Sequence, residues 1–175
     1  HAFRHQQCFA YPTEAVFGLG CDPLSEIAMM EILRLKSRPV EKGVILIAGS
    51  FEQLTPFVHI EKIPSEHQQA VIKSWPGPTT WLLPKSDLTP RWISGDSDLV
   101  AVRVTNHPLV QQMCQHVNSP MVSTSANPAG LEPARTSQQV RSYFSDELLI
   151  VDGSLGKQQT PSVIINGLNL ETLRA

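Results

Sequence analysis

The sequence has few cysteines and few aromatic residues for its length. Only three of its 175 residues are cysteines, at positions 8, 21 and 114, and aromatic residues make up 6%. The cysteines are odd in number, widely spaced and without the close Cys or His neighbours of a zinc site. They are therefore expected to be reduced residues packed in the interior, which suits a cytoplasmic protein.

Long hydrophobic runs are also absent. No stretch approaches 18 consecutive apolar residues, and residues 1–5 lack the hydrophobic core of a signal peptide. We therefore expect a soluble protein with no membrane partner. Because the chain begins with His1 and is predicted to enter a strand almost at once, a preceding segment is expected to be missing from this sequence.

There is no excess of positive charge and no standard nucleotide cradle. The 14 Lys and Arg residues against 16 Asp and Glu residues give a net charge of -2, so any basic patch must be local. The Gly-Lys-Ser/Thr phosphate loop is missing, and no third glycine follows Gly18 and Gly20 at the dinucleotide spacing. A nucleotide bound by this chain must be held in another way.

The length and the apolar pattern predict one domain over residues 1–175, with an α/β (α+β) fold. Such a domain can bury roughly 70% of its unfolded surface, and no repeat, low-complexity tract or linker divides it. Short runs rich in branched apolar residues, bounded by Gly, Pro, Asn or Asp, predict strands. These runs lie at residues 8–11, 44–48, 79–83, 99–104, 121–124, 148–151 and 163–165.

Helical patterns lie between these runs. Ser25 is a good N-cap for a helix over residues 25–36, and apolar residues repeat at three and four from Pro108 to Val117. Thr136 and Gln139 form a capping box for a third helix, and shorter helices are expected at residues 50–57 and 65–74. Helices mingled with so many strands predict a single twisted, mixed sheet flanked by helices.

Three distant segments concentrate the residues that could do chemistry. They are residues 11–14 (Tyr-Pro-Thr-Glu), residues 36–39 (Lys-Ser-Arg-Pro) with Lys42 close behind, and residues 123–127 (Ser-Thr-Ser-Ala-Asn). Together they predict one anion-binding pocket suited to a polyphosphate. Each segment alone also fits an ordinary structural role: a turn with a glycine bend, cations that complement a helix dipole, or hydroxyls that satisfy a turn.

Two further observations support the pocket and leave an alternative open. Lys36, Arg38 and Lys42 are like charges within seven residues, and a bound anion would relieve their repulsion. In the first segment, Thr13 and the Tyr11 ring are expected to line the ligand. Arg103 lies in an apolar strand, where its guanidinium either points outward or reaches a carboxylate or phosphate inside a cavity.

The motifs also resemble those of a known family. Tyr-Pro-Thr-Glu, Phe-Gly-Leu-Gly-Cys-Asp, Leu-Lys-x-Arg-Pro, Trp-Pro-Gly-Pro-Thr-Thr, Ala-Val-Arg-Val-Thr-Asn-His-Pro and Ser-Thr-Ser-Ala-Asn are similar, in this order, to the YrdC/TsaC family of threonylcarbamoyl-AMP synthases. The resemblance runs from about residue 10 to residue 174. It implies the short, single-domain bacterial form, with a large concave basic cavity.

The resemblance implies a reaction and its partners. L-threonine, bicarbonate or CO2, and ATP would give threonylcarbamoyl-AMP and pyrophosphate, with Mg2+ accompanying ATP and held by phosphates rather than by side chains. A downstream tRNA threonylcarbamoyl transferase complex would use the product, and tRNA itself is a possible partner. By similarity, Lys36 and Arg38 are the implied catalytic residues. The implied ATP-binding residues are Lys36, Arg38, Ser125, Asn127, Arg135 and Arg174, and the implied threonine-binding residues are Thr13, Arg103 and Ser162.

Two other functions remain compatible with the sequence. One is an RNA-binding module of the same fold that holds tRNA or rRNA without catalysis, although the net charge and the scarcity of aromatic stacking residues disfavour it. The other is a paralogue that carbamoylates a different substrate.

Overall fold

The computed structural model describes residues 1–145 and 148–174. Within these residues, nine strands form one mixed sheet, so the predicted sheet is confirmed. The strands are β1 (Phe9–Pro12), β2 (Phe17–Gly20), β3 (Ile45–Ala48), β4 (Thr79–Pro84), β5 (Leu99–Val104), β6 (Met121–Ser125), β7 (Leu149–Ile150), β8 (Val163–Asn166) and β9 (Thr172–Arg174).

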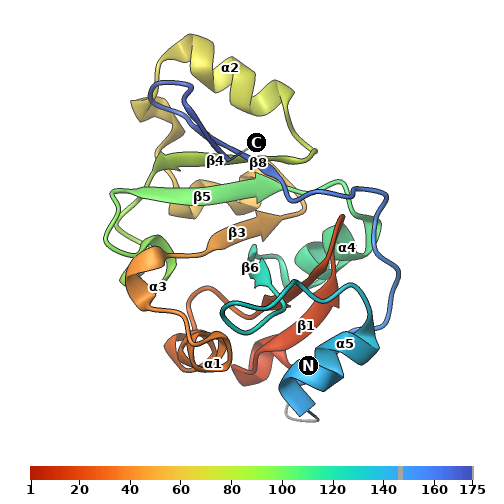
Figure 1. Cartoon of the computed structure of the whole chain (residues 1–175). Helices are drawn as coiled ribbons and strands as arrows, with labels where there is room; N and C mark the ends of the chain where they lie inside the picture. Colours follow the sequence, from red (N-terminus) through yellow and green to blue (C-terminus); the bar gives the residue numbers. More distant parts are fainter. Residues whose placement is uncertain (146–147, 175) are drawn as a thin grey trace.

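The strand order is β7-β1-β2-β6-β3-β5-β4-β8-β9. Strand β6 joins the part formed by β7, β1 and β2 to the part formed by β3, β5, β4, β8 and β9. It pairs antiparallel to β2 on one side and to β3 on the other. The pairs β3 with β5, β4 with β8 and β1 with β7 are parallel, and the remaining neighbours are antiparallel. Figure 1 shows the sheet running through the molecule from β1 to β4.

Helices pack around this sheet, as predicted. They are α1 (Glu26–Lys36), α2 (Ser65–Lys73), α3 (Arg91–Ser94), α4 (Pro108–Val117) and α5 (Ser137–Phe144). The predicted caps are confirmed: the Ser25 hydroxyl accepts the Ala28 N–H at 3.3 Å, and the Thr136 hydroxyl accepts the Gln139 N–H at 3.1 Å. The helix expected at residues 50–57 is instead two short 3-10 turns, Phe51–Gln53 and Thr55–Phe57.

Two strands were not predicted from the sequence, and one of them changes the interpretation of a motif. The glycines at positions 18 and 20 belong to β2, which pairs with β1. A Cβ at Gly20 would stand 2.6 Å from a ring carbon of Tyr11. Gly20 therefore admits the Tyr11 ring rather than a ligand. The second unpredicted strand is β9, which is short and exposed.

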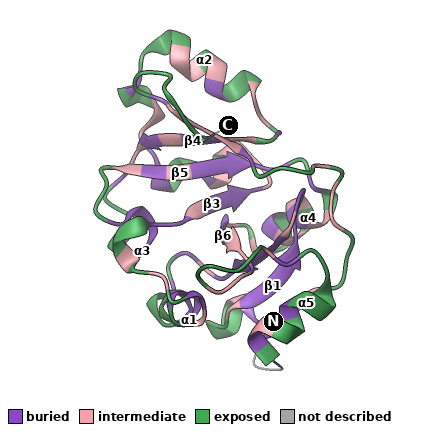
Figure 2. Ribbon diagram, in the orientation of Figure 1, coloured by how far each residue is buried: buried purple, intermediate pink, exposed green. Residues whose placement is uncertain are grey.

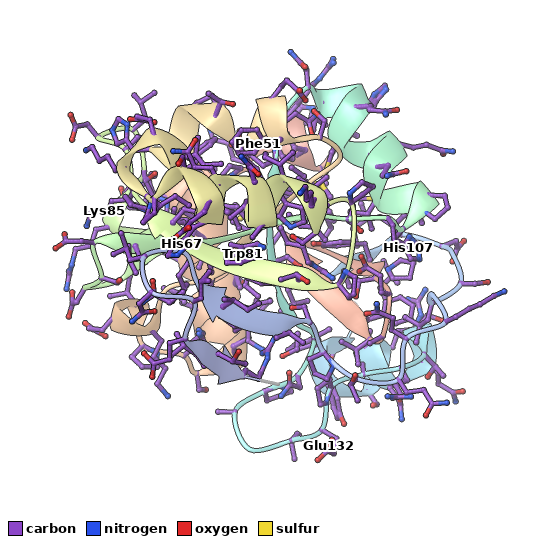
Figure 3. The ribbon with its side chains drawn as sticks, turned by 90° about the horizontal axis from the view of Figure 1, so that it is seen from above. Phe51, His67, Trp81, Lys85, His107 and Glu132 are labelled. Atoms are coloured by element: carbon purple, nitrogen blue, oxygen red, sulfur yellow. The ribbon has the colours of Figure 1, made fainter. Side chains whose placement is uncertain are left out.

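The two faces of β5 face different surroundings. Val100, Val102 and Val104 are buried in the main hydrophobic core, whereas Leu99, Ala101 and Arg103 line a cavity on the other face. This is the alternation expected of a strand with side-chain period two. Figure 2 shows that the central strands are mostly buried and that the helices around them carry many exposed residues, and Figure 3 shows Trp81 of β4 next to α2.

The three cysteines are free and lie wholly or partly in the interior, as predicted. Cys21 and Cys114 are buried and free, and burial raises the pKa of the partly buried Cys8 to about 11. Across residues 1–145 and 148–174, every helix is too short or too polar to cross a membrane.

The turn between α3 and β5 depends on a glycine, which packs against the segment before β3. Gly95 has a φ of +65°, and a Cβ there would stand 2.1 Å from the Glu41 carbonyl oxygen. We expect Gly95→Ala to lower the free energy of unfolding by about 3 kcal/mol, because both the backbone conformation and the contact are unfavourable. Urea unfolding followed by circular dichroism measures this loss.

Gly130 is the matched control. Its φ is +83°, but no atom lies within 4 Å of the position of a Cβ. Gly130→Ala should therefore lower the free energy of unfolding by only about 1 kcal/mol, because the left-handed backbone conformation is the only unfavourable factor. Equal losses for the two variants would show that the Gly95 contact does not restrict this turn.

Candidate ligand cavity

One cavity of about 570 Å³ brings together many of the polar residues singled out in the sequence. Its walls come from the turn after β1, the turn before β3, strands β5 and β6, and the C-terminal strands. The residues predicted as site residues that line it are Thr13, Arg38, Arg103, Ser125, Ser162 and Arg174. Lys36, Asn127 and Arg135 are not among the lining residues.

Arg103 points into the structure, which resolves the alternative that the sequence left open. Its Nη2 lies 3.1 Å from Oε2 of Glu14, and both side chains are less than a tenth exposed. The Thr105 hydroxyl donates a hydrogen bond of 2.5 Å to Oε1 of the same carboxylate. Nε of Arg103 has no hydrogen-bond partner among the residues that the structure describes. Arg103 is thus a buried cation with one protein carboxylate beside it and one donor unused.

Arg174 lies with the residues predicted for threonine rather than with those predicted for ATP. Its Nε and Nη2 donate to the Ser162 carbonyl at 3.0 and 2.8 Å, and Nη2 also lies 3.2 Å from the Ser162 hydroxyl. The Thr80 hydroxyl is 2.8 Å from the same hydroxyl. Burial, and then the nearby Arg103 cation, lower the pKa of Arg174. Arg103 and Arg174 therefore form one cationic end of the cavity.

Lys36 is buried beside the cavity and is occupied by the loop after β6. Its ammonium donates to the carbonyl oxygens of Ser125 and Asn127, the latter at 2.8 Å, and to Oδ1 of Asn127 at 3.3 Å. The residue is 5% exposed, and burial together with the neighbouring Arg38 lowers the pKa of Lys36 to about 8. Lys36 thus fixes the position of residues 125–127.

Arg38 and Lys42 form a second cationic region of the cavity wall. Arg38 donates to the Gly43 carbonyl through Nε at 3.2 Å and Nη2 at 2.8 Å, and burial lowers its pKa. Within the described part of the chain, no hydrogen bond or ion pair involves the Lys42 ammonium, and the adjacent Glu41 lies 3.8 Å from Arg91. Lys42 therefore offers its charge to the cavity.

The other predicted residues have structural partners outside the cavity. Asn127 donates through Nδ2 to the carbonyls of Pro128 at 3.2 Å and Leu131 at 2.6 Å. Arg135 donates to the Gln159 carbonyl at 2.8 Å. The expectation that the Tyr11 ring lines the ligand is wrong: Tyr11 is wholly buried in the core, and its hydroxyl donates to the Val122 carbonyl at 3.2 Å.

A strap that the sequence did not reveal completes the wall. Residues 151–162 run from β7 at one edge of the sheet to β8 near the other edge, along one side of the molecule (Figure 1). Gly156 N–H donates to the Thr13 carbonyl at 2.9 Å, and Gln158 N–H to the Glu14 carbonyl at 3.2 Å. A Cβ at Gly156 would lie 2.8 Å from Glu14 Cα, so only glycine permits this approach.

The fold and the cavity define the class: a single-sheet α/β protein with a cationic ligand cavity. Two cationic regions, Arg103 with Arg174 and Arg38 with Lys42, share a space whose volume is typical of small-molecule sites. Over the described residues, no group of three or more His, Cys, Asp or Glu side chains could hold a metal ion. The arrangement suits anionic groups such as carboxylates and phosphates.

The Sua5/YciO/YrdC family, described as "Telomere recombination", matches residues 1–175. The chain belongs to this family, which confirms the resemblance found in the sequence. Relatives with the name threonylcarbamoyl-AMP synthase include one from Pseudoalteromonas atlantica, 51% identical over 95% of this chain and 89% of that protein. Another, from Klebsiella pneumoniae, is 50% identical over 98% of this chain and 90% of that protein.

Solved structures agree with this assignment. Sua5 of P. abyssi complexed with L-threonine is 34% identical, with a TM-score of 0.86 over 94% of this chain and 48% of that chain. A double variant of the same Sua5 gives a TM-score of 0.90 at 32% identity, over 98% of this chain and 52% of that one. This chain therefore spans about half the length of these Sua5 chains. E. coli YciO, at 19% identity and a TM-score of 0.82, shares the fold.

Proposed function

We propose that this protein is a threonylcarbamoyl-AMP synthase, which joins L-threonine, bicarbonate or CO2, and ATP and releases pyrophosphate. The observation that carries the proposal is the single cavity that contains both Arg38 and Arg103. Two relatives with the name threonylcarbamoyl-AMP synthase are 51% and 50% identical to this chain and match nearly all of it.

Threonine is assigned to the end of the cavity that holds Arg103. A guanidinium is a strong partner for an amino-acid carboxylate, and Arg103 lines the cavity. Thr13 and Ser162 line the same cavity, although the Thr13 hydroxyl donates to the Val16 carbonyl at 2.7 Å. Their hydroxyl oxygens can accept hydrogen bonds from the substrate amine or hydroxyl.

ATP is assigned to the region of Arg38, Lys42 and Ser125. Arg38 and Lys42 supply the positive charge for phosphates, and Ser125 is placed by the contact between its carbonyl oxygen and Lys36. Lys36, Asn127 and Arg135 then act on ATP by shaping the adjacent loop and strap rather than by direct contact in this conformation. Magnesium is expected to enter with ATP and to be held by phosphate oxygens and water.

The reaction requires positioning more than a protein nucleophile. The neutral amine of threonine captures CO2, and the resulting carbamate oxygen attacks the α-phosphorus while the bond to pyrophosphate breaks. Holding these reactants in one cavity can contribute up to about 7 to 11 kcal/mol to the barrier reduction. Arg38 and Lys42 would stabilise the negative charge that grows on the phosphate oxygens.

The proposed reaction also indicates where the product goes and where the protein acts. The product would pass to a tRNA threonylcarbamoyl transferase complex, and the cytoplasm is the proposed place of action because tRNA is modified there.

One assay tests the proposed function. Purified protein is incubated with ATP, Mg2+, bicarbonate and each amino acid in turn, and pyrophosphate release is measured. We expect release that requires threonine. Release with another amino acid would indicate a paralogue with a different substrate. No release with any amino acid, together with tight RNA binding, would favour the RNA-binding module.

Lys42 gives a prediction that is specific to phosphate binding. We expect Lys42→Met to raise the KM for ATP about tenfold, since an exposed cation at a phosphate contributes roughly one to two kcal/mol. The KM for threonine and the midpoint of thermal unfolding should stay near the wild-type values, because the ammonium has no described protein partner. An unchanged KM for ATP would remove Lys42 from the phosphate site. Lys62→Met, at an exposed residue outside the cavity lining, is the matched control.

A further inference from the structure

Glu14 is a buried carboxylate to which the proposed reaction gives no direct role. Its side chain is 4% exposed, and its two oxygens meet different partners: Oε1 accepts the Thr105 hydroxyl at 2.5 Å, and Oε2 lies 3.1 Å from Nη2 of Arg103. Oε2 accepts no aligned hydrogen bond from the described residues, so the contact with Arg103 is an ion pair. Glu14 therefore contacts the cation assigned to threonine, and it lines the same cavity.

Thr105 is fixed in turn. It is fully buried, its N–H donates to the Ala48 carbonyl at 3.0 Å, and its hydroxyl oxygen accepts the His107 N–H at 3.0 Å. The hydroxyl has a single hydrogen, and that hydrogen points to Glu14 because an ionised carboxylate can only accept. His107 is the N-cap residue of α4. The hydrogen bonds that hold Glu14 through Thr105 therefore start at the N-terminus of this helix.

The backbone around Glu14 is fixed as well. The Glu14 carbonyl accepts the Gln158 N–H at 3.2 Å, and the neighbouring Thr13 carbonyl accepts the Gly156 N–H at 2.9 Å. The strap therefore holds the main chain of Glu14 while Thr105 holds its carboxylate.

We propose that Glu14 and Thr105 are positioning residues that hold the Arg103 guanidinium in the orientation that receives the substrate carboxylate. An arginine side chain loses considerable rotamer freedom when it is ordered, and ordering it in advance improves binding. The Glu14 carboxylate also balances the buried charge when no substrate is present. The inference rests on the proposed function, which assigns Arg103 to threonine.

Thr105→Val tests the proposal, since it removes the hydroxyl with little change in shape. We expect the KM for threonine to rise about tenfold while the KM for ATP changes by less than about twofold. Thr105→Ser keeps the hydroxyl and should restore the KM for threonine to within about twofold of wild type. A folded Thr105→Val protein with the wild-type KM for threonine would overturn the proposal.

A measurement without substrate separates this inference from the proposed function. The 15N–1H resonance of Arg103 Nε is assigned by its loss in Arg103→Met. It should shift or broaden in Thr105→Val and Glu14→Gln, and it should stay in place in Thr105→Ser. An unchanged Arg103 Nε resonance in both Thr105→Val and Glu14→Gln would overturn the positioning role, even if the wild-type protein releases pyrophosphate. If wild-type protein releases none, the proposed function fails, and the resonances still report whether Glu14 and Thr105 hold Arg103.

Discussion

Lys36→Met is expected to lower kcat/KM for ATP about 100-fold and to destabilise the fold by about 3 kcal/mol. The physical reason is the position of the ammonium, which serves the carbonyls of Ser125 and Asn127 and the Asn127 side chain. Without it, partly buried acceptors lose their donor, and the loop after Ser125 can move. Steady-state kinetics and chemical unfolding measure the two effects.

The comparison with Lys42→Met distinguishes an indirect role from a direct one. Lys42→Met should affect the KM for ATP and leave stability unchanged, whereas Lys36→Met should change both. If Lys36→Met kept wild-type stability and lost only activity, the Lys36 ammonium would act on the substrate and not on the loop. A variant as active as wild type would exclude Lys36 from the site.

Arg103→Met is expected to abolish measurable threonine binding and to lower the free energy of unfolding by about 3 to 5 kcal/mol. The stability loss follows because the Glu14 carboxylate, 3.1 Å from Arg103, would remain buried without a cation. The loss of binding follows because the substrate carboxylate would have no guanidinium to meet. Isothermal titration with L-threonine, alongside urea unfolding, measures both effects.

The double variant Arg103→Met with Glu14→Gln separates the two effects. Replacing the carboxylate removes the uncompensated charge, so most of the lost stability should return while threonine binding stays lost. A double variant that recovers threonine affinity would show that Arg103 is not the carboxylate partner. A double variant that is as unstable as Arg103→Met would show that the ion pair is not the source of the loss.

The sequence predicted the fold well wherever local chemistry determines structure. The caps at Ser25 and Thr136 and the helix from Pro108 are confirmed, because capping and apolar periodicity act within a few residues. The strand β2 was missed because its two glycines resemble a loop. The role of Gly20 depends on the Tyr11 ring, which is brought near by strand pairing and not by sequence proximity.

The site was predictable in composition but not in the direction of its side chains. The motifs identified Thr13, Arg38 and Arg103, and these residues do line one cavity. Whether a lysine at a helix end faces the cavity or the loop depends on the packing of distant segments, and Lys36 faces the loop. The Glu14–Arg103 pair links residues that are 89 positions apart in the sequence, and nothing local in either segment indicates such a contact.

The order of strands in the sheet has a consequence for synthesis on the ribosome. β1 pairs with β7, and β4 pairs with β8, so the earliest and latest parts of the chain meet in one sheet. Ser162 and Arg174 reach the cavity only from these late segments. A nascent chain that has reached α4 can form helices and a few strand pairs, but it has no complete pocket. The rate at which the pocket appears is therefore governed by closure of long loops, which makes folding slow and leaves strand edges open to chaperones in the meantime.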